Sequence, residues 1–246
     1  NMSHDIRTPM NAIVGIADLL GYETESSERI KEYTRRLQNS SHHLLGLLND
    51  ILDMSRIESG ISSLNLEKLE LSEQISQIET IIRTNTRERR QQFEIRTRMI
   101  RHEQINGNGT HLRQILLNIL TNAAKYTPDG GRIIFEITEL DSEPGYAEYQ
   151  FTISDNGMGM RQEDVKNILS DNKKVPKHGS GVGLINVHTR IQLMFGAKYG
   201  LIVESEPDEG TTVTIHLPAI PYTEENCELL ENGVKKPGNE GDDEKT

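Results

Sequence analysis

The first sixty residues carry apolar side chains at the spacing of packed helices. Residues 1–22 place apolar or small side chains at alternating steps of four and three: Ile6, Met10, Ile13, Ala17 and Leu20. The stretch 21–27 interrupts this seam, and a second seam runs from Ile30 to Met54 before Gly60. Steps of four and three predict two antiparallel helices. A hairpin with such broad stripes cannot bury them alone, so we expect residues 1–60 to form a homodimeric four-helix bundle; packing of the hairpin onto the rest of its own chain is the alternative.

From about residue 63 the pattern changes to helices that alternate with strands. Helices are predicted at 70–88, 110–126, 161–169 and 182–195, and strands at 92–99, 132–140, 146–154, 199–205 and 211–217. Two pairs of strands follow each other across short turns, so the sheet should be at least partly antiparallel. We therefore expect an α+β chain with a helical hairpin at 1–62, an α/β sandwich domain at 63–220 and a disordered tail or linker at 221–246, where eight acidic residues outnumber three lysines.

Charge and composition exclude several classes of binding partner. The 246 residues contain 27 Lys+Arg and 38 Asp+Glu, for a net charge of −11, with no Trp and 4% aromatic residues. This balance argues against a nucleic-acid partner, and the seven arginines between 83 and 101 are interrupted by glutamates, as on a solvated face. The single Cys227 excludes an intrachain disulfide. No apolar run approaches the roughly 20 residues of a membrane span, so we expect a cytoplasmic stretch without direct membrane contact. The start at Asn1 indicates a piece of a longer protein, for which a membrane anchor elsewhere stays open.

The segment Ser3–Pro9 on the first predicted helix has the chemistry of a nucleophile. His4 and Thr8 are four residues apart, so they share one helix face, off the apolar seam. Pro9 cannot donate to the carbonyl of Asp5, and the helix should bend there. A neutral imidazole can attack while Asp5 orients or deprotonates its second ring nitrogen. A surface histidine on a polar helix face is the alternative.

The predicted helix at 110–126 carries a second candidate group of polar residues. Asn118, Asn122 and Lys125 are spaced by four and three on a face away from the apolar stripe. Amide oxygens suit Mg²⁺ and a lysine suits phosphate. A solvated polar face is the alternative.

Two glycine-rich segments follow predicted strands or open helices. Asp155 ends a strand and precedes Asn-Gly-Met-Gly-Met, where a carboxylate can accept a hydrogen bond from an adenine amino group and glycines let backbone approach the base. The run 179–184 opens a helix, and glycine-rich backbone at a helix N-terminus can hold phosphate. Each segment alone is also an ordinary turn.

Taken in order, these segments resemble the motifs of two-component sensor histidine kinases. The string from Ser3 to Ile13 resembles their phospho-acceptor box, and the segments at 118–127, 155–160, 179–184 and 210–212 resemble the N, G1 and G2 boxes and the closing motif of their ATPase domain. The resemblance implies that His4 accepts a phosphoryl group with Asp5 as acid/base partner, and that Thr8 supports a reverse phosphatase reaction. It also implies a GHKL-type (Bergerat) sandwich fold.

The resemblance further implies a site for Mg²⁺ and ATP. Asn122 would bind Mg²⁺, and Asp155 would recognise adenine. The remaining residues implied to contact the nucleotide are Asn118, Lys125, Tyr126, Gly157, Gly159, Gly179, Gly181, Gly183, Leu184 and Thr211. The phosphohistidine would pass to an aspartate on the receiver domain of a response regulator.

The stretch between the two glycine-rich segments departs from the family pattern. Residues 161–178 contain no Phe, whereas the family has a phenylalanine-bearing F box there; they contain Lys173, Lys174, Lys177 and His178 instead. A kinase-deficient phosphatase or scaffold that binds a response regulator is therefore the alternative function. A general ATPase clamp of the gyrase or chaperone type is a third, against which the phospho-acceptor box argues.

Overall fold

The computed structural model describes residues 2–22, 27–38, 40–41, 44, 67–142, 145–169, 182–223 and 226. The chain divides into two compact units, Asn1–Ser62 and Ser63–Thr246. Among the described helices, none combines the length and apolar character that a membrane span requires.

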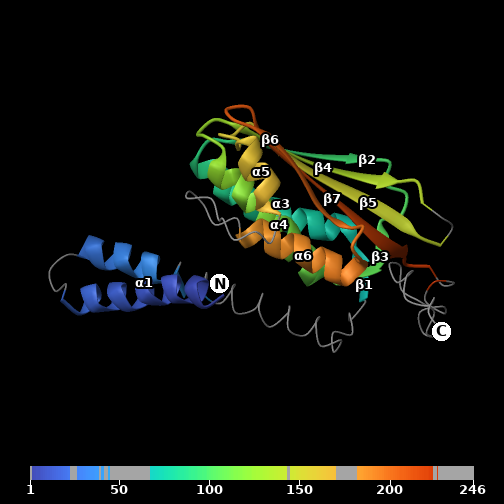
Figure 1. Cartoon of the computed structure of the whole chain (residues 1–246). Helices are drawn as coiled ribbons and strands as arrows, with labels where there is room; N and C mark the ends of the chain where they lie inside the picture. The colour runs from blue at the N-terminus through green and yellow to red at the C-terminus, as the bar shows by residue number, and fades with distance from the viewer. Residues whose placement is uncertain are drawn as a thin grey trace, which may run out of the picture. The chain divides into compact units, whose positions relative to one another are not determined.

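The first unit is a helical hairpin whose apolar stripe is only partly covered. Helix α1 (Met2–Tyr22) continues through Pro9, and residues 27–38 form a second helix that returns alongside it (Figure 1). Ile13, Ile16 and Leu20 are half-buried, as are the second-seam residues from Tyr33 to Leu44 that the structure describes. The predicted seam positions Met10 and Ala17 are exposed instead. The predicted seam beyond residue 44 lies outside the described residues.

The second unit is built on one mixed sheet. In the described part of the chain, seven strands follow the order β1-β3-β7-β5-β4-β2, with β6 also paired to β7. The strands are β1 (Glu67–Glu70), β2 (Gln92–Arg98), β3 (Gln104–Gly107), β4 (Arg132–Leu140), β5 (Ala147–Asp155), β6 (Gly200–Glu206) and β7 (Gly210–Pro221). β2 and β4 run parallel, whereas the other strand pairs among the described residues are antiparallel.

Helices cover one face of this sheet. Figure 1 shows α3 (Leu71–Glu88), α4 (Gly109–Tyr126) and α6 (Val182–Phe195) on the same side, with the short α5 (Gln162–Ile168) near β6. Every second residue of β4 and β5 is buried, as with Ile133, Phe135 and Ile137, because successive strand residues point to opposite faces. The predicted apolar stripe of α4, from Leu112 to Ala123, is buried against them. The predicted α+β sandwich is therefore confirmed.

The structure corrects the expected pattern at two places. The sequence did not predict β1 and β3, which are four residues each and pair with one another. It also placed the last strand at 211–217 and the tail from 221, but β7 continues to Pro221 because β3 pairs with its end. Beyond it, Tyr222 N donates to Gln104 O at 2.8 Å, and the buried Asn226 donates to Pro221 O at 3.0 Å. The packed domain thus extends past the boundary predicted at residue 220.

Candidate nucleotide site

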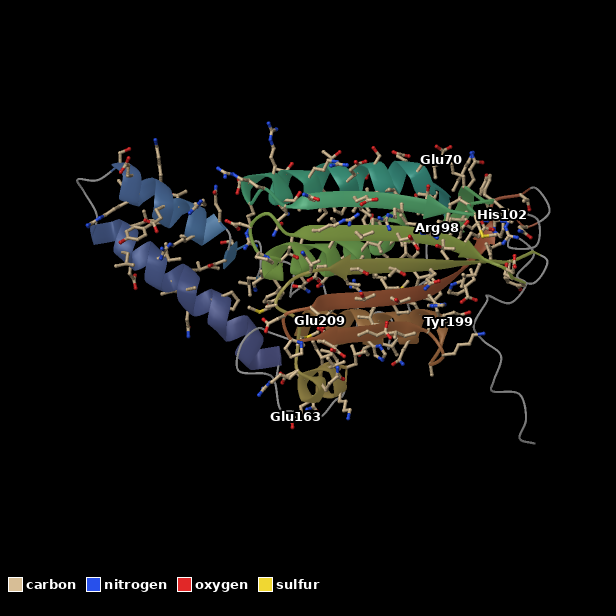
Figure 2. The ribbon with its side chains drawn as sticks, turned by 90° about the horizontal axis from the view of Figure 1, so that it is seen from above. Glu70, Arg98, His102, Glu163, Tyr199 and Glu209 are labelled. Atoms are coloured by element: carbon tan, nitrogen blue, oxygen red, sulfur yellow. The ribbon has the colours of Figure 1, made fainter. Side chains whose placement is uncertain are left out.

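The predicted motifs of the second unit meet at one end of the sandwich. In the register of the sheet, Asp155 at the end of β5 lies opposite Thr211 at the start of β7. The end of α4 adjoins them, since Met158 N donates to Tyr126 O at 3.4 Å. We call this edge, defined by Tyr126, Asp155, Gly157 and Gly210, the nucleotide end. Figure 2 shows Glu209, on the β6–β7 turn beside Gly210, at the opposite end of the sheet from Tyr199 and His102.

Two backbone N–H groups orient the carboxylate of Asp155 at the nucleotide end. Its carboxylate Oδ1 accepts a hydrogen bond from Gly157 N at 2.8 Å, and it also accepts one from the backbone N–H of Thr211. Burial raises the pKa of Asp155, while these two backbone donors lower it and offset part of that shift. An ionised carboxylate only accepts hydrogen bonds, so the group is matched to a donor such as the amino group of adenine.

The glycines of this end allow backbone segments to approach closely. Gly159 has a φ of +60°, and a Cβ there would stand 1.8 Å from the carbonyl oxygen of Glu206. Gly210 has a φ of +116°, and its Cβ would stand 1.9 Å from the carbonyl oxygen of Asp155. Neither position has room for a side chain. Gly159 was predicted to let the backbone approach a base, whereas its nearest neighbour in the structure is the backbone of β6.

The polar face of α4 lies beside the start of α6. Asn118 and Asn122 are half-buried, and Asn122 Nδ2 donates to Asn118 Oδ1 at 3.4 Å. A Cβ on Gly183 would stand 2.9 Å from Asn118 Oδ1, so the absence of a side chain lets α6 begin against this amide. Lys125 and Tyr126 are exposed at the end of the helix, with Lys125 Nζ 5.0 Å from the centre of the Tyr126 ring.

The side chains at the nucleotide end limit which kinds of metal ion could bind there. The described residues contain no group of three His, Cys, Asp or Glu that could hold a metal ion. Mg²⁺ commonly retains water and is held through one or two protein oxygens together with phosphates. Two neighbouring amides fit that mode, and they do not fit an ion that needs an all-protein cage.

Two residues that the sequence analysis missed hold the end of α4. Arg89 Nη1 donates to Ala124 O at 2.7 Å and to Lys125 O at 2.9 Å, and Gln91 Nε2 donates to Ala124 O at 2.9 Å and to Thr127 O at 2.7 Å. The last carbonyls of a helix lack intrahelical partners, so these donors cap α4 where its nucleotide residues lie. Arg89 was predicted to belong to a solvated face, which is wrong for this arginine. No local motif marks it, because its partners are 35 and 36 residues away.

Several predicted site residues lie outside what the structure describes. Gly179, Gly181 and the basic residues at 173–178 are among them, whereas Leu184 is buried in the core behind Gly183. His4, Asp5 and Thr8 lie on α1, and only the backbone of the helix is described at these positions.

Comparison with known proteins identifies both units. Residues 1–60 match the His Kinase A (phospho-acceptor) domain family, and residues 107–221 match the histidine kinase-, DNA gyrase B- and HSP90-like ATPase family. The autoinducer 2 sensor kinase/phosphatase LuxQ of Vibrio vulnificus is 32% identical over 223 residues, which are 88% of this chain and 26% of LuxQ. The chain spans about a quarter of the length of the first curated relatives it matches.

Two solved structures share the fold. Full-length ShkA in complex with AMPPNP has a TM-score of 0.63 at 24% identity, covering 90% of this chain and 45% of ShkA. The histidine kinase ThkA in complex with the response regulator protein TrrA has a TM-score of 0.60 at 18% identity, covering 91% of this chain and 60% of ThkA. With a phospho-acceptor domain followed by an ATPase domain, the chain belongs to the two-component sensor histidine kinases and carries their catalytic core.

Proposed function

We propose that this chain transfers the γ-phosphoryl group of ATP to His4 and passes it to an aspartate on a response regulator. The observation that carries this proposal is the pairing of a phospho-acceptor domain with an ATPase domain whose motif residues gather at one end. The complex of ThkA with the response regulator protein TrrA supports the second step.

The first step is a nucleophilic substitution at phosphorus. The unprotonated ring nitrogen of His4 attacks the γ-phosphorus, and the bond from this phosphorus to the oxygen that bridges to the β-phosphate breaks, so ADP leaves. Asp5 accepts the proton from the other ring nitrogen. Positioning and electrostatics would supply most of the acceleration, as in other phosphoryl transfers.

The second unit would hold the nucleotide in two parts. Asp155 would accept a hydrogen bond from the adenine amino group, with Gly157 and Thr211 framing the base and Gly159 letting the loop after Asp155 pack against β6. Asn118, Lys125, Tyr126 and the segment of Gly179, Gly181 and Gly183 would contact the ribose and phosphates, while the buried side chain of Leu184 would anchor that segment in the core. Asn122 would hold Mg²⁺, which when bound neutralises phosphate charge.

The uncovered flank of α1 supports a homodimer. Met10 and Val14 are 46% and 55% exposed, and with Ala17 they form one stripe beside the half-buried Ile13 and Leu20. A second hairpin would bury this stripe in a four-helix bundle.

The decisive experiment is incubation with γ-³²P-ATP and Mg²⁺. We expect an acid-labile, alkali-stable label that is lost in His4→Ala, while calorimetry shows unchanged nucleotide binding in that variant. A label that persists in His4→Ala would refute the assignment of the acceptor. Asn122→Ala should lose Mg²⁺-dependent ATP binding, and unchanged binding would refute its assigned role.

A second candidate function is a phosphatase or scaffold without kinase activity. The absence of Phe from residues 161–178 favours it, and so does the similarity to LuxQ, which is named a sensor kinase/phosphatase. In that function Thr8 would orient a water for attack on the phosphorylated receiver. Titration with a non-hydrolysable ATP analogue separates the two, because a scaffold has no need to bind nucleotide.

A further inference from the structure

One serine hydroxyl connects the two segments that flank Asp155. Ser205 lies on β6 and is 7% exposed. Its Oγ accepts a hydrogen bond from Met160 N at 2.8 Å, donates to Gly210 O at 2.7 Å, and lies 2.9 Å from Thr211 Oγ1. A hydroxyl has one proton to donate and two lone pairs to accept with. All three are therefore in use if Thr211 donates.

The connected segments are those that orient the carboxylate of Asp155. Met160 lies in the loop that contains Gly157, and Gly210 precedes Thr211 at the start of β7. The two backbone donors to Asp155 come from the same segments, one from Gly157 and one from Thr211. Ser205 is thus one of the contacts that hold these donors together, beside the hydrogen bond from Asp208 N to Met158 O at 2.9 Å and the pairing of Asp155 with Thr211. A further bond from Gln162 Nε2 to Ser205 O at 2.9 Å attaches the start of α5 to the same strand.

We propose that Ser205 is a positioning residue for recognition of the adenine base. It fixes the loop after Asp155 against the first residues of β7, and so sets the direction in which the carboxylate accepts a hydrogen bond. This rests on the proposed function, in which Asp155 binds the adenine amino group. Ser205 touches no nucleotide itself and acts through Gly157 and Thr211.

The chain provides a matched control for this hydroxyl. Ser154 Oγ lies 2.9 Å from Thr212 Oγ1, the same distance as from Ser205 Oγ to Thr211 Oγ1. Ser154 and Thr212 are directly opposite in the register of β5 and β7, and both are half-buried. Ser205 and Thr211 are likewise opposite each other on β6 and β7, so each contact joins strands that the backbone ladder already pairs. The difference is that Ser205 also accepts a hydrogen bond from the loop, at Met160 N. Ser154→Ala therefore removes an equivalent hydroxyl without releasing the segment after Asp155.

The test compares Ser205→Ala and Ser154→Ala with the wild-type chain by calorimetric titration. The ligands are ATP, GTP and inorganic tripolyphosphate, each with Mg²⁺. GTP has a carbonyl oxygen where ATP has the amino group, and tripolyphosphate has no base. We expect Ser205→Ala to weaken ATP binding by about five- to tenfold, the effect of one lost hydrogen-bonded contact, and to leave tripolyphosphate binding unchanged.

The preference for ATP over GTP distinguishes positioning from general destabilisation. A variant that only unfolds more easily loses the same fraction of sites for every ligand, so the ratio of the two dissociation constants stays constant. We expect the ratio to fall towards one in Ser205→Ala and to stay at the wild-type value in Ser154→Ala. An unchanged ratio in Ser205→Ala, or an equal fall in both variants, would overturn the proposal. Failure of the wild-type chain to bind ATP would instead overturn the proposed function.

Discussion

A buried carboxylate at the end of the sandwich opposite the nucleotide offers the sharpest test of what stabilises the domain. The side chain of Glu139, on β4, is 0% exposed. It accepts hydrogen bonds from Arg101 N at 2.5 Å and His102 N at 2.9 Å, and it contacts His102 Nδ1 at 2.7 Å. Arg101 Nε lies 3.3 Å from it. These contacts hold the loop that joins β2 to β3, near the labelled His102 in Figure 2.

Glu139→Ala should lower the free energy of unfolding by about 3–5 kcal/mol, because it leaves two backbone N–H groups without their buried acceptor and removes the ion pair with Arg101. The control is Glu148→Ala, whose carboxylate pairs with His216 at 3.2 Å where both side chains are 33% exposed. A pair at that exposure contributes only about 0–1 kcal/mol. In a unit of this size 1 kcal/mol corresponds to about 2–4 °C in Tm, so we expect a loss of about 6–20 °C against less than about 4 °C.

The assay is thermal and urea unfolding followed by circular dichroism, since the chain has no Trp for fluorescence. Amide hydrogen exchange should accelerate at Arg101 and His102 in Glu139→Ala, and the affinity of the folded protein for ATP should not change. Equal losses of stability in Glu139→Ala and Glu148→Ala would refute the reasoning, because burial of the carboxylate would then make no difference.

The same carboxylate gives a pH dependence of known sign. Burial alone would raise the pKa of Glu139, but the N–H groups of His102 and Arg101 and the His102 ring together hold the pKa below its ordinary value of 4.5. A lowered pKa in the folded state means that the carboxylate stabilises the fold above the ordinary pKa and that this contribution is lost as the pH falls through the lowered one. Glu139→Gln should flatten that part of the stability curve, and a curve that keeps its slope would contradict this assignment.

Three further predictions concern the nucleotide end. Gly159→Ala should cost about 1–3 kcal/mol of unfolding free energy and abolish ATP binding, because its Cβ would stand 1.8 Å from Glu206 O; calorimetry and unfolding curves would show both. Arg89→Met should weaken ATP binding, because the carbonyl of Lys125 at the end of α4 loses its hydrogen-bond donor. Arg89→Lys should keep part of the affinity. Full affinity for ATP in Arg89→Met would argue against a role of Arg89 in capping α4. Burial raises the pKa of Asp155, so the free energy of unfolding should decrease as the pH rises through that pKa, and Asp155→Asn should remove the decrease.

The parts of the fold that could be predicted are those with a strong local pattern. β4 and β5 alternate buried and half-buried residues over nine positions each, and α4 has an apolar stripe over its whole length. β1 and β3 have four residues each, with one buried apolar side chain in Leu69 and one in Ile105. A segment that short shows no period, and its pairing depends on a partner more than thirty residues away. The end of β7 was missed for the same reason, because β3 determines it.

The residues of the nucleotide end also differ in how far the sequence predicts them. Asp155, Asn118 and Asn122 belong to continuous strings, so their neighbourhood in the structure follows once those strings are placed on β5 and α4. Ser205 and Arg89 belong to no such string. The loop residue that donates to Ser205 is 45 residues away in the sequence. A serine on a strand has no sequence feature that distinguishes this contact from an ordinary polar position. Residues that touch a ligand are therefore easier to find in a sequence than residues that position them.

The two ends of the sandwich should respond to mutation independently. Across the β4–β5 hairpin, Ile133 lies opposite Asp155 and Glu139 lies opposite Tyr149, so the two carboxylates are six residue steps apart along the sheet, about 20 Å at roughly 3.3 Å per step. Between them the buried face is filled by Ile133, Phe135 and Ile137, without a shared polar partner. Changes that far apart usually add to within about 0.5 kcal/mol. Hydroxyl and backbone contacts hold the nucleotide end, and a buried carboxylate holds the opposite end. The double variant Ser205→Ala/Glu139→Ala should therefore lose as much unfolding free energy as the two single variants together. Its preference for ATP over GTP should equal that of Ser205→Ala alone.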